Sequence, residues 1–121
     1  MPARRCSCDY CRRFDGAWTS HPDARLAIRV HDESGVTRYR FGTKTADFIF
    51  CSRCGVTLFA VCELQHRLRG VVNVHTLSVP AVDGQEPSFV LDWQSACFDG
   101  ETVEQRLQRR AERWIGIVNF V

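Results

Sequence analysis

The chain has 121 residues and a formal net charge of +2 at pH 7, so it has the length of one ordinary domain and too little charge to favour nucleic-acid binding. No apolar run approaches the roughly 18 residues of a membrane span, and the first residues, MPARRCSCDYCRRF, lack the apolar stretch of a secretory signal. We therefore expect one domain over residues 1–121, cytoplasmic and without membrane association, whose oligomeric state the sequence leaves open.

The first third of the chain is expected to form a loop followed by a hairpin. Residues 1–20 carry closely spaced cysteines, which is typical of a cysteine-rich loop. Residues 25–31 alternate apolar and polar side chains, as a half-buried strand does. Residues 32–35 indicate a turn and the alternation resumes over 36–41, so these two segments are predicted to pair with each other.

Three more strands are predicted in the middle of the chain. Residues 47–50 form a short apolar segment that runs into Cys51, and residues 56–62 have the composition of a second strand. Residues 63–69 are polar and predict a loop. The β-branched run at 71–77 predicts the third strand.

The last third is expected to end in a helix. Residues 80–87 contain two prolines and an Asp-Gly pair and predict an irregular segment, after which residues 89–93 form an edge strand. A turn at 99–100 precedes Thr102, which is placed to cap a helix over 103–113. One stripe of that helix holds Val103, Leu107, Arg110 and Trp114, and Glu104 is placed to pair with Gln108. With about five or six short antiparallel strands and one late helix, the fold is predicted to be mainly β.

Seven cysteines are many for a chain of this length. Because no secretory signal precedes them, reduced thiols are expected, and clustered thiols favour metal binding over disulfides. Five of the seven form two clusters. The other two, Cys62 and Cys97, lie inside apolar segments and are expected to be small buried hydrophobic side chains.

The second cluster, Cys51-Ser52-Arg53-Cys54-Gly55, is typical of a zinc knuckle. Two cysteines separated by two residues can hold one tetrahedral ion from a tight turn, and the following glycine accommodates a positive φ. A redox dithiol of the thioredoxin type would begin a helix, whereas β-type segments flank this pair on both sides.

The first cluster places Cys6, Cys8 and Cys11 within six residues. Three thiolates fill three corners of a tetrahedron and leave the fourth open, which is the arrangement of catalytic zinc, whereas four protein ligands make a structural site. Five clustered cysteines leave two alternatives open. Either one zinc takes four of the five, or the first cluster holds an open zinc while Cys51 and Cys54 supply only half a site.

Arginine and histidine residues offer further candidates. Arg12 and Arg13, which follow Cys11 directly, either belong to a solvated surface or receive the carboxylates of a bound anion. Arg4 and Arg5 bracket the same cluster from its other side. Among four scattered histidines, His75 lies in a predicted strand and is a candidate to line a pocket.

These motifs, taken together, resemble the glutathione-dependent formaldehyde-activating enzyme family, which also includes centromere protein V. The resemblance rests on Cys6-x-Cys8-x-x-Cys11-Arg12-Arg13 with Gly16, on Tyr39-Arg40-Phe41-Gly42, on Phe50-Cys51-Ser52-Arg53-Cys54-Gly55, and on Val72-Asn73-Val74-x-x-Leu77. It implies a mainly β, tent-like zinc fold of the Mss4 class. It also implies a catalytic zinc at Cys6, Cys8 and Cys11 and a structural zinc at Cys51 and Cys54.

The family's structural zinc also uses a Cys-x-Cys pair ahead of the three-cysteine motif, and this sequence has none there. Three explanations stay open: a natural protein with an earlier start, one zinc that draws on both clusters, or a metal-free pair at Cys51 and Cys54.

The activity that the resemblance implies is a carbon–sulfur lyase reaction, in which a thiol (glutathione in the family) adds reversibly to formaldehyde or a related small aldehyde. Arg12 and Arg13 are then candidates to bind glutathione carboxylates, and Trp18 is a candidate to wall the pocket. The alternative is a zinc-stabilised binding module without turnover. Nucleic-acid binding, by analogy with centromere protein V, is not favoured by the small net charge.

Overall fold

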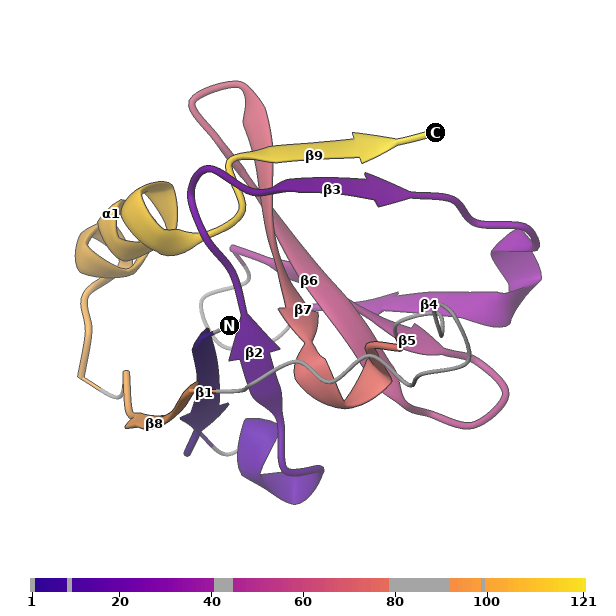
Figure 1. The fold of residues 1–121 in the computed structure, drawn as a ribbon, viewed down its shortest axis with the longest axis horizontal. Helices are drawn as coiled ribbons and strands as arrows, with labels where there is room; N and C mark the ends of the chain where they lie inside the picture. Colours follow the sequence, from indigo (N-terminus) through magenta and orange to yellow (C-terminus); the bar gives the residue numbers. More distant parts are fainter. Residues whose placement is uncertain (1, 9, 41–44, 79–91, 99) are drawn as a thin grey trace, which may run out of the picture.

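The protein folds into a seven-stranded sheet and a two-stranded sheet with one α-helix, in a computed structural model that describes residues 2–8, 10–40, 45–78, 92–98 and 100–121. The large sheet has the strand order β4-β5-β6-β7-β2-β1-β8, and β3 pairs with β9 in the small one (Figure 1). The elements are β1 (Pro2–Cys6), η1 (Cys11–Arg13), β2 (Ala17–Thr19), β3 (Arg25–Ile28), η2 (Glu33–Gly35), β4 (Val36–Tyr39), β5 (Asp47–Cys51), β6 (Thr57–Leu64), β7 (Arg67–Asn73), η3 (Val74–Thr76), β8 (Asp92–Ala96), α1 (Val103–Arg113) and β9 (Ile117–Phe120). The prediction of a mainly β fold with one late helix is confirmed.

The strands predicted at 47–50 and 56–62 correspond to β5 and β6, whereas the strand predicted at 71–77 is right only as far as Asn73, where β7 ends and η3 begins. The loop expected at 63–69 is wrong. There β6 and β7 pair in continuous antiparallel register, down to Leu64 opposite Arg67. Gln65 and His66 form the two-residue turn, with φ of 54° and 60°. Positive φ values at both turn residues are typical of a tight hairpin, but glutamine and histidine do not predict them from the sequence.

The hairpin expected between residues 25–31 and 36–41 is also wrong. β3 pairs in parallel with β9, and β4 pairs with β5. Ile28 and Val118 from the small sheet pack with Ile49 and Val61 from the large one in a shared core cluster. Burial of this apolar surface, rather than closeness in sequence, selects the partners. The parallel β3–β9 and β1–β8 pairs also depart from the expected all-antiparallel strands.

Strand β6 is buried on both faces, because a separate core cluster packs against each of them. Val61 faces the cluster covered by β3 and β9, whereas Ala60 and Cys62 face a second cluster. That second cluster includes Cys11, Trp18 and Trp114. The N-terminal cysteine segment therefore packs against one side of the core and is part of it.

Residues 1–20 are not the loop that the sequence suggested. β1 lies between β2, its antiparallel neighbour, and β8, its parallel neighbour at the sheet edge. The predicted edge strand at 89–93 overlaps β8 at Asp92 and Trp93. Several residues used in the sequence analysis lie outside the described residues: Phe41, Gly42, residues 80–87 and 89–91, and Asp99.

The helix is confirmed at its predicted bounds. The Thr102 hydroxyl accepts from the Gln105 amide N–H at 3.1 Å, and the Gln105 side chain accepts from the Thr102 N–H at 3.0 Å, which completes a capping box. The Gln108 amide donates to Glu112 at 2.8 Å, on the following turn rather than to Glu104. Neither this helix nor any 3-10 turn in the described segments has the length and apolar character needed to cross a membrane.

Candidate metal centre

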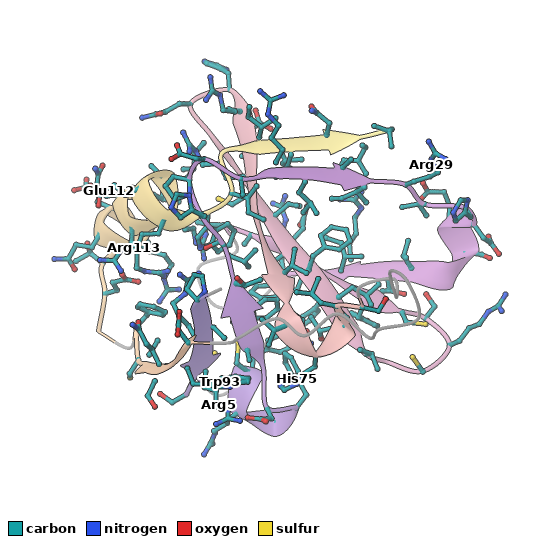
Figure 2. All side chains as sticks on the ribbon, in the orientation of Figure 1. Arg5, Arg29, His75, Trp93, Glu112 and Arg113 are labelled. Carbon is teal, nitrogen blue, oxygen red and sulfur yellow. The ribbon has the colours of Figure 1, made fainter. Side chains whose placement is uncertain are left out.

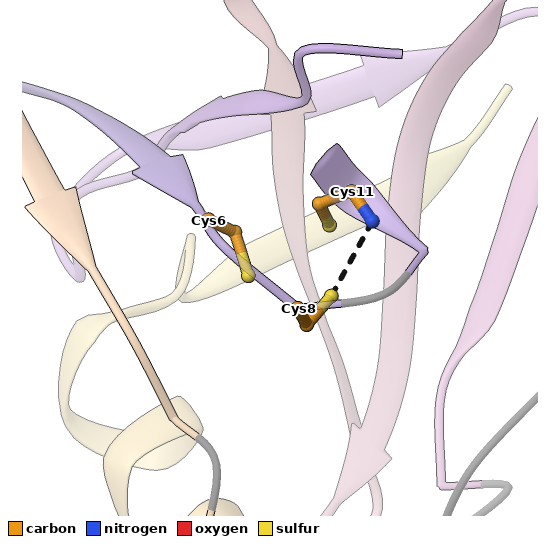
Figure 3. A group of neighbouring side chains, drawn as sticks. All are labelled: Cys6, Cys8 and Cys11. Atoms are coloured by element: carbon orange, nitrogen blue, oxygen red, sulfur yellow. Dashed lines mark hydrogen bonds between the residues drawn. The ribbon is translucent and has the colours of Figure 1, made fainter. Parts of the chain in front are cut away.

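Cys6, Cys8 and Cys11 come together where β1 ends and η1 begins. Their three sulfur atoms lie within 4.8 Å of one another and turn toward a common point (Figure 3). In a tetrahedral zinc site with Zn–S bonds near 2.3 Å, sulfur atoms are about 3.8 Å apart, so a small contraction brings these three to bonding positions. The donor set therefore fits a thiophilic divalent ion held by three protein ligands.

Backbone hydrogen bonds fold the segment between the cysteines into a compact bend. The Cys6 N–H donates to the Gly16 carbonyl at 3.2 Å, and the Gly16 N–H donates to the Cys11 carbonyl at 2.8 Å. A Cβ at Gly16 would stand 2.9 Å from the Phe14 ring and 3.1 Å from the Cys11 Cβ. Gly16 is needed here because the chain passes too close to the cysteine bend to carry a side chain.

Two N–H groups donate to the cysteine sulfurs. The Cys11 backbone N–H lies 3.4 Å from Cys8 Sγ, and Trp18 Nε1 lies 3.3 Å from Cys11 Sγ. Such outer partners orient metal ligands and offset thiolate charge. Trp18 is only 6% exposed, so its indole donates to Cys11 from within the core. Its assignment as a wall of a substrate pocket stays a prediction.

The three thiols differ in pKa. The hydrogen bond from Cys11 lowers the pKa of Cys6 to about 6. The same hydrogen bond, together with burial, raises the pKa of Cys11, while burial raises that of Cys8. The cluster thus already favours one thiolate near neutral pH, and binding of a divalent cation would favour deprotonation of the other two.

The cluster is accessible from one side. Cys11 is 3% exposed, whereas Cys6 and Cys8 are only half-buried. Burial of Cys11 among Tyr10, Phe14 and Trp18 closes the inner side. An ion held here would therefore be approached from the side of Cys6 and Cys8.

The second cysteine pair forms a turn between β5 and β6. The Gly55 N–H donates to the Cys51 carbonyl at 2.8 Å, and Gly55 has φ +77°, as a zinc knuckle requires. Backbone N–H groups of Cys54 and Arg53 lower the pKa of Cys51. Cys54 is exposed and Cys51 is half-buried.

The structure does not bring the two cysteine clusters together. Among the described residues, which include all seven cysteines and all four histidines, Cys6, Cys8 and Cys11 form the group of three or more candidate ligands that meets the distance criterion. Cys51 and Cys54 are not part of it. One zinc drawing on both clusters is therefore not the arrangement found, and metal binding by the knuckle stays a prediction.

An arginine that the sequence did not single out also acts on the cysteine group. Arg12 and Arg13 are both exposed on η1, and their role in anion binding stays a prediction. Arg109, from α1, lies close enough to Cys6 to help lower the pKa of its thiol.

Three further candidates have clear outcomes. Cys62 is 3% exposed, as expected, and lies 3.6 Å from Arg110 Nη1. Cys97 is exposed, so its assignment as a buried hydrophobic residue is wrong. His75 is exposed on η3, with Nε2 lying 3.1 Å from the Asp15 carbonyl oxygen and its ring 6.1 Å from that of Trp93.

No family model matches the chain. A protein of Rhodobacter sphaeroides with a crystal structure is 31% identical over 76% of this chain and 80% of its own, with a TM-score of 0.46. It is described by its source alone, so the similarity assigns neither an activity nor a ligand.

Proposed function

We propose that this protein is a zinc–thiolate enzyme that adds a low-molecular-weight thiol to formaldehyde or a related small aldehyde. Cys6, Cys8 and Cys11 would hold the zinc. The observation that carries the proposal is the convergence of three sulfurs within 4.8 Å, without Cys51 or Cys54 among them. Three protein ligands leave one coordination position for an exogenous ligand, the pattern of catalytic zinc.

The chain's own residues would divide the work at this site. Trp18 Nε1 donates a hydrogen bond to Cys11 Sγ, and the Cys11 N–H donates one to Cys8 Sγ. Two of the three cysteine sulfurs would therefore be oriented before zinc binds. Cys6, at the end of β1, lies on the accessible side. Bound zinc would supply one effect, a lowered pKa of the incoming thiol near neutral pH.

The reaction itself is a redox-neutral addition. The thiol sulfur forms a bond to the aldehyde carbon, the carbonyl π electrons move to oxygen, and that oxygen takes up the proton that the thiol has lost. The product is an S-hydroxyalkyl thioether, and the reverse reaction releases both components. Glutathione and formaldehyde are the substrates that the sequence resemblance favours.

A purely structural zinc is the second candidate. Cys11 and Trp18 lie in the same core cluster as Val71 and Trp114, so an ion bound here would also stabilise the fold. The fourth ligand separates the two candidates. A fourth protein ligand would make the site structural, whereas water or a small thiol would make it open to substrate.

Cobalt substitution of the full-length chain tests the proposal. We expect one Co²⁺ per chain at the three cysteines, with sulfur-to-cobalt absorption that changes when glutathione is added. S-Methylglutathione, which lacks the free thiol, is the matched control and should leave the spectrum unchanged. A spectrum of four sulfur ligands that ignores glutathione would establish the structural alternative.

Turnover needs a separate measurement, because thiols also add to formaldehyde without a catalyst. Exchange between ¹³C-formaldehyde and its glutathione adduct, followed by NMR, should be faster with the zinc protein than with the buffer alone. The Cys8→Ser variant supplies the protein control. Equal exchange rates for both proteins would contradict the enzymatic assignment while leaving thiol binding intact.

A further inference from the structure

The turn between β5 and β6 carries the two cysteines that the three-cysteine group does not use. The Cys51 N–H donates to the Val56 carbonyl at 2.9 Å, and the Gly55 N–H donates to the Cys51 carbonyl at 2.8 Å. Gly55 has φ +77°, which allows the chain to reverse into β6. These hydrogen bonds and the glycine close a tight turn with Cys51 at its start and Cys54 near its end.

The turn is also supported by strand β4 and the 3-10 turn η2. The Ser52 N–H donates to the Gly35 carbonyl at 2.9 Å, and the hydroxyls of Ser52 and Thr37 form a hydrogen bond of 2.7 Å. Arg53 Nη2 lies 3.9 Å from Asp32 in an exposed ion pair. None of these contacts uses a cysteine side chain, so replacement of one thiol should leave the backbone of the turn in place.

The two thiols of this turn lie close to each other. Cys51 Sγ forms hydrogen bonds with the backbone N–H groups of Cys54 and Arg53 and with the Cys54 thiol. Residues three apart in a tight turn have Cα atoms less than about 7 Å apart, and disulfides join Cα atoms that are about 4.4–6.8 Å apart. A disulfide could therefore form here with little movement of the backbone.

The N–H groups of the turn replace those of a helix start. In dithiols of the thioredoxin type, a helix N-terminus stabilises the attacking thiolate, and the sequence argument against a redox pair was that no helix begins here. The structure supplies the N–H groups of Arg53 and Cys54 to Cys51 Sγ from a turn between two strands. The flanking strands are therefore compatible with a redox pair.

The pair is accessible and supplies only two of the four ligands of a structural zinc. Cys54 is exposed and Cys51 is half-buried. Among the described residues, no His, Cys, Asp or Glu completes a group of three donor atoms with them within 4.8 Å. In Figure 2 this turn, at the lower right, lies well apart from the labelled Arg5 on β1, the strand that ends at Cys6. Because two thiolates fill half of a tetrahedral site, both thiols remain available for other chemistry.

We propose that Cys51 and Cys54 form a redox-active dithiol that exchanges with low-molecular-weight disulfides. The Cys51 thiolate attacks one sulfur of such a disulfide, which forms a mixed disulfide and releases one thiolate. The Cys54 sulfur then attacks the Cys51 sulfur, closes the internal disulfide and releases the second thiolate. The pair loses two electrons and two protons in total, and the small disulfide is reduced to two thiols.

This reaction is separate from the aldehyde chemistry proposed at the three-cysteine group, because it uses no metal and none of that group's sulfurs. The two remaining cysteines differ in access. Cys62 is 3% exposed and is shielded from small disulfides. Cys97 is exposed and has no cysteine near it in the sequence, so it serves as a comparison thiol within the same chain.

The test exposes the reduced full-length chain, carrying one equivalent of zinc, to 2-hydroxyethyl disulfide. N-Ethylmaleimide traps the remaining thiols at successive times, and tryptic peptides are identified by mass. Trypsin cuts after Arg53, so a Cys51–Cys54 disulfide joins two peptides that reduction separates. We expect this joined species to accumulate in monomeric protein, with Cys51 reacting at least about tenfold faster than Cys97. Dithiothreitol should restore both free thiols.

Single variants separate the roles of the two thiols. Cys54→Ser should stop at a mixed disulfide on Cys51, because the thiol that resolves it is missing. Cys51→Ser should lose the fast reaction and react at Cys54 no faster than at Cys97. Cys97→Ser is the matched control and should form the internal disulfide at the wild-type rate. Melting temperatures close to that of wild type would establish that the turn is intact in each variant.

Four results would overturn the inference: no joined peptide, a joined peptide only in covalent dimers, a Cys51 rate equal to that of Cys97, or complete protection of the pair by excess zinc. The last would make the pair a metal site. None of these results affects the proposed function, because the cobalt experiment tests the three-cysteine group independently. Conversely, failure of that cobalt experiment leaves the exchange reaction of Cys51 and Cys54 unaffected, since peptide mapping assigns each disulfide separately.

Discussion

Two cysteine segments with the same internal spacing have different surroundings in this protein. Cys8 and Cys11 are separated by two residues, as are Cys51 and Cys54. The first pair gains a third thiol from the end of β1 and lies against buried aromatic rings, whereas the second pair remains two ligands on a surface turn. The spacing of two cysteines therefore predicts that they can hold one ion together. The neighbouring strand determines how many further ligands a candidate site has.

Because the first cluster is more buried than the second, ionising its thiols costs more free energy. Thiolates that lie in a partly apolar setting are costly unless cations or N–H donors offset their charge. Around Cys51, two backbone N–H groups and solvent provide that compensation. Metal removal is therefore expected to affect the three-cysteine group far more than the knuckle.

Loss of one ligand should give the largest contrast. Cys8→Ser is expected to lower zinc affinity by more than about 100-fold, because only two thiolates would remain, while Cys54→Ser leaves the affinity of the three-cysteine group unchanged. Competition with a chromophoric chelator measures both values. A comparable loss in Cys54→Ser would mean that the two clusters share an ion after all.

Thiol ionisation in the metal-free, reduced protein should separate the clusters next. The pKa of Cys6 is lowered from 9.0 to about 6, so its thiolate stabilises the fold fully above about pH 9. That contribution shrinks as the pH falls toward 6 and is absent below it. Thiolate absorbance should show a group with pKa about 6 in wild type and Cys51→Ser, but not in Cys6→Ser.

The indole donor should matter for the first cluster by a smaller factor. Trp18→Phe removes the N–H that donates to Cys11 Sγ and is expected to weaken zinc binding about tenfold. Trp114→Phe is the matched control, because Trp114 is buried in the same core cluster but, within the described segments, forms no hydrogen bond with the sulfur of Cys6, Cys8 or Cys11. Both variants should lower the melting temperature. Equal loss of zinc affinity would show that packing alone matters.

The smallest effect is expected at the knuckle. Gly55→Ala forces alanine into φ +77° and should cost about 1 kcal/mol of unfolding free energy, or roughly 3–5 °C in melting temperature. Gly35→Ala, where a Cβ meets nothing within 4 Å and φ is not positive, should cost less. Zinc binding by the three-cysteine group should not change in either variant. A drop in that affinity for Gly55→Ala would reveal a link between the clusters.

Local signals explain which predictions were confirmed. The helix could be bounded because its cap and its apolar stripe are encoded within a dozen neighbouring residues. Apolar runs in the sequence predict strands β5 and β6. The positive φ at residue 55 is predictable because the residue is glycine. The convergence of Cys6, Cys8 and Cys11 was predictable for the same reason, since a short chain segment limits how far apart they can lie.

Pairings between distant segments could not be obtained in this way. β3 joins β9 from the far end of the chain, and β1 lies between β2 and β8, because those arrangements bury apolar faces that no single segment can bury alone. The same pairings decide that Trp18 donates to Cys11 and that the Cys51–Cys54 pair lies outside the three-cysteine group. The local sequence specifies the candidate metal ligands, whereas long-range packing, which depends on the whole core at once, specifies their surroundings.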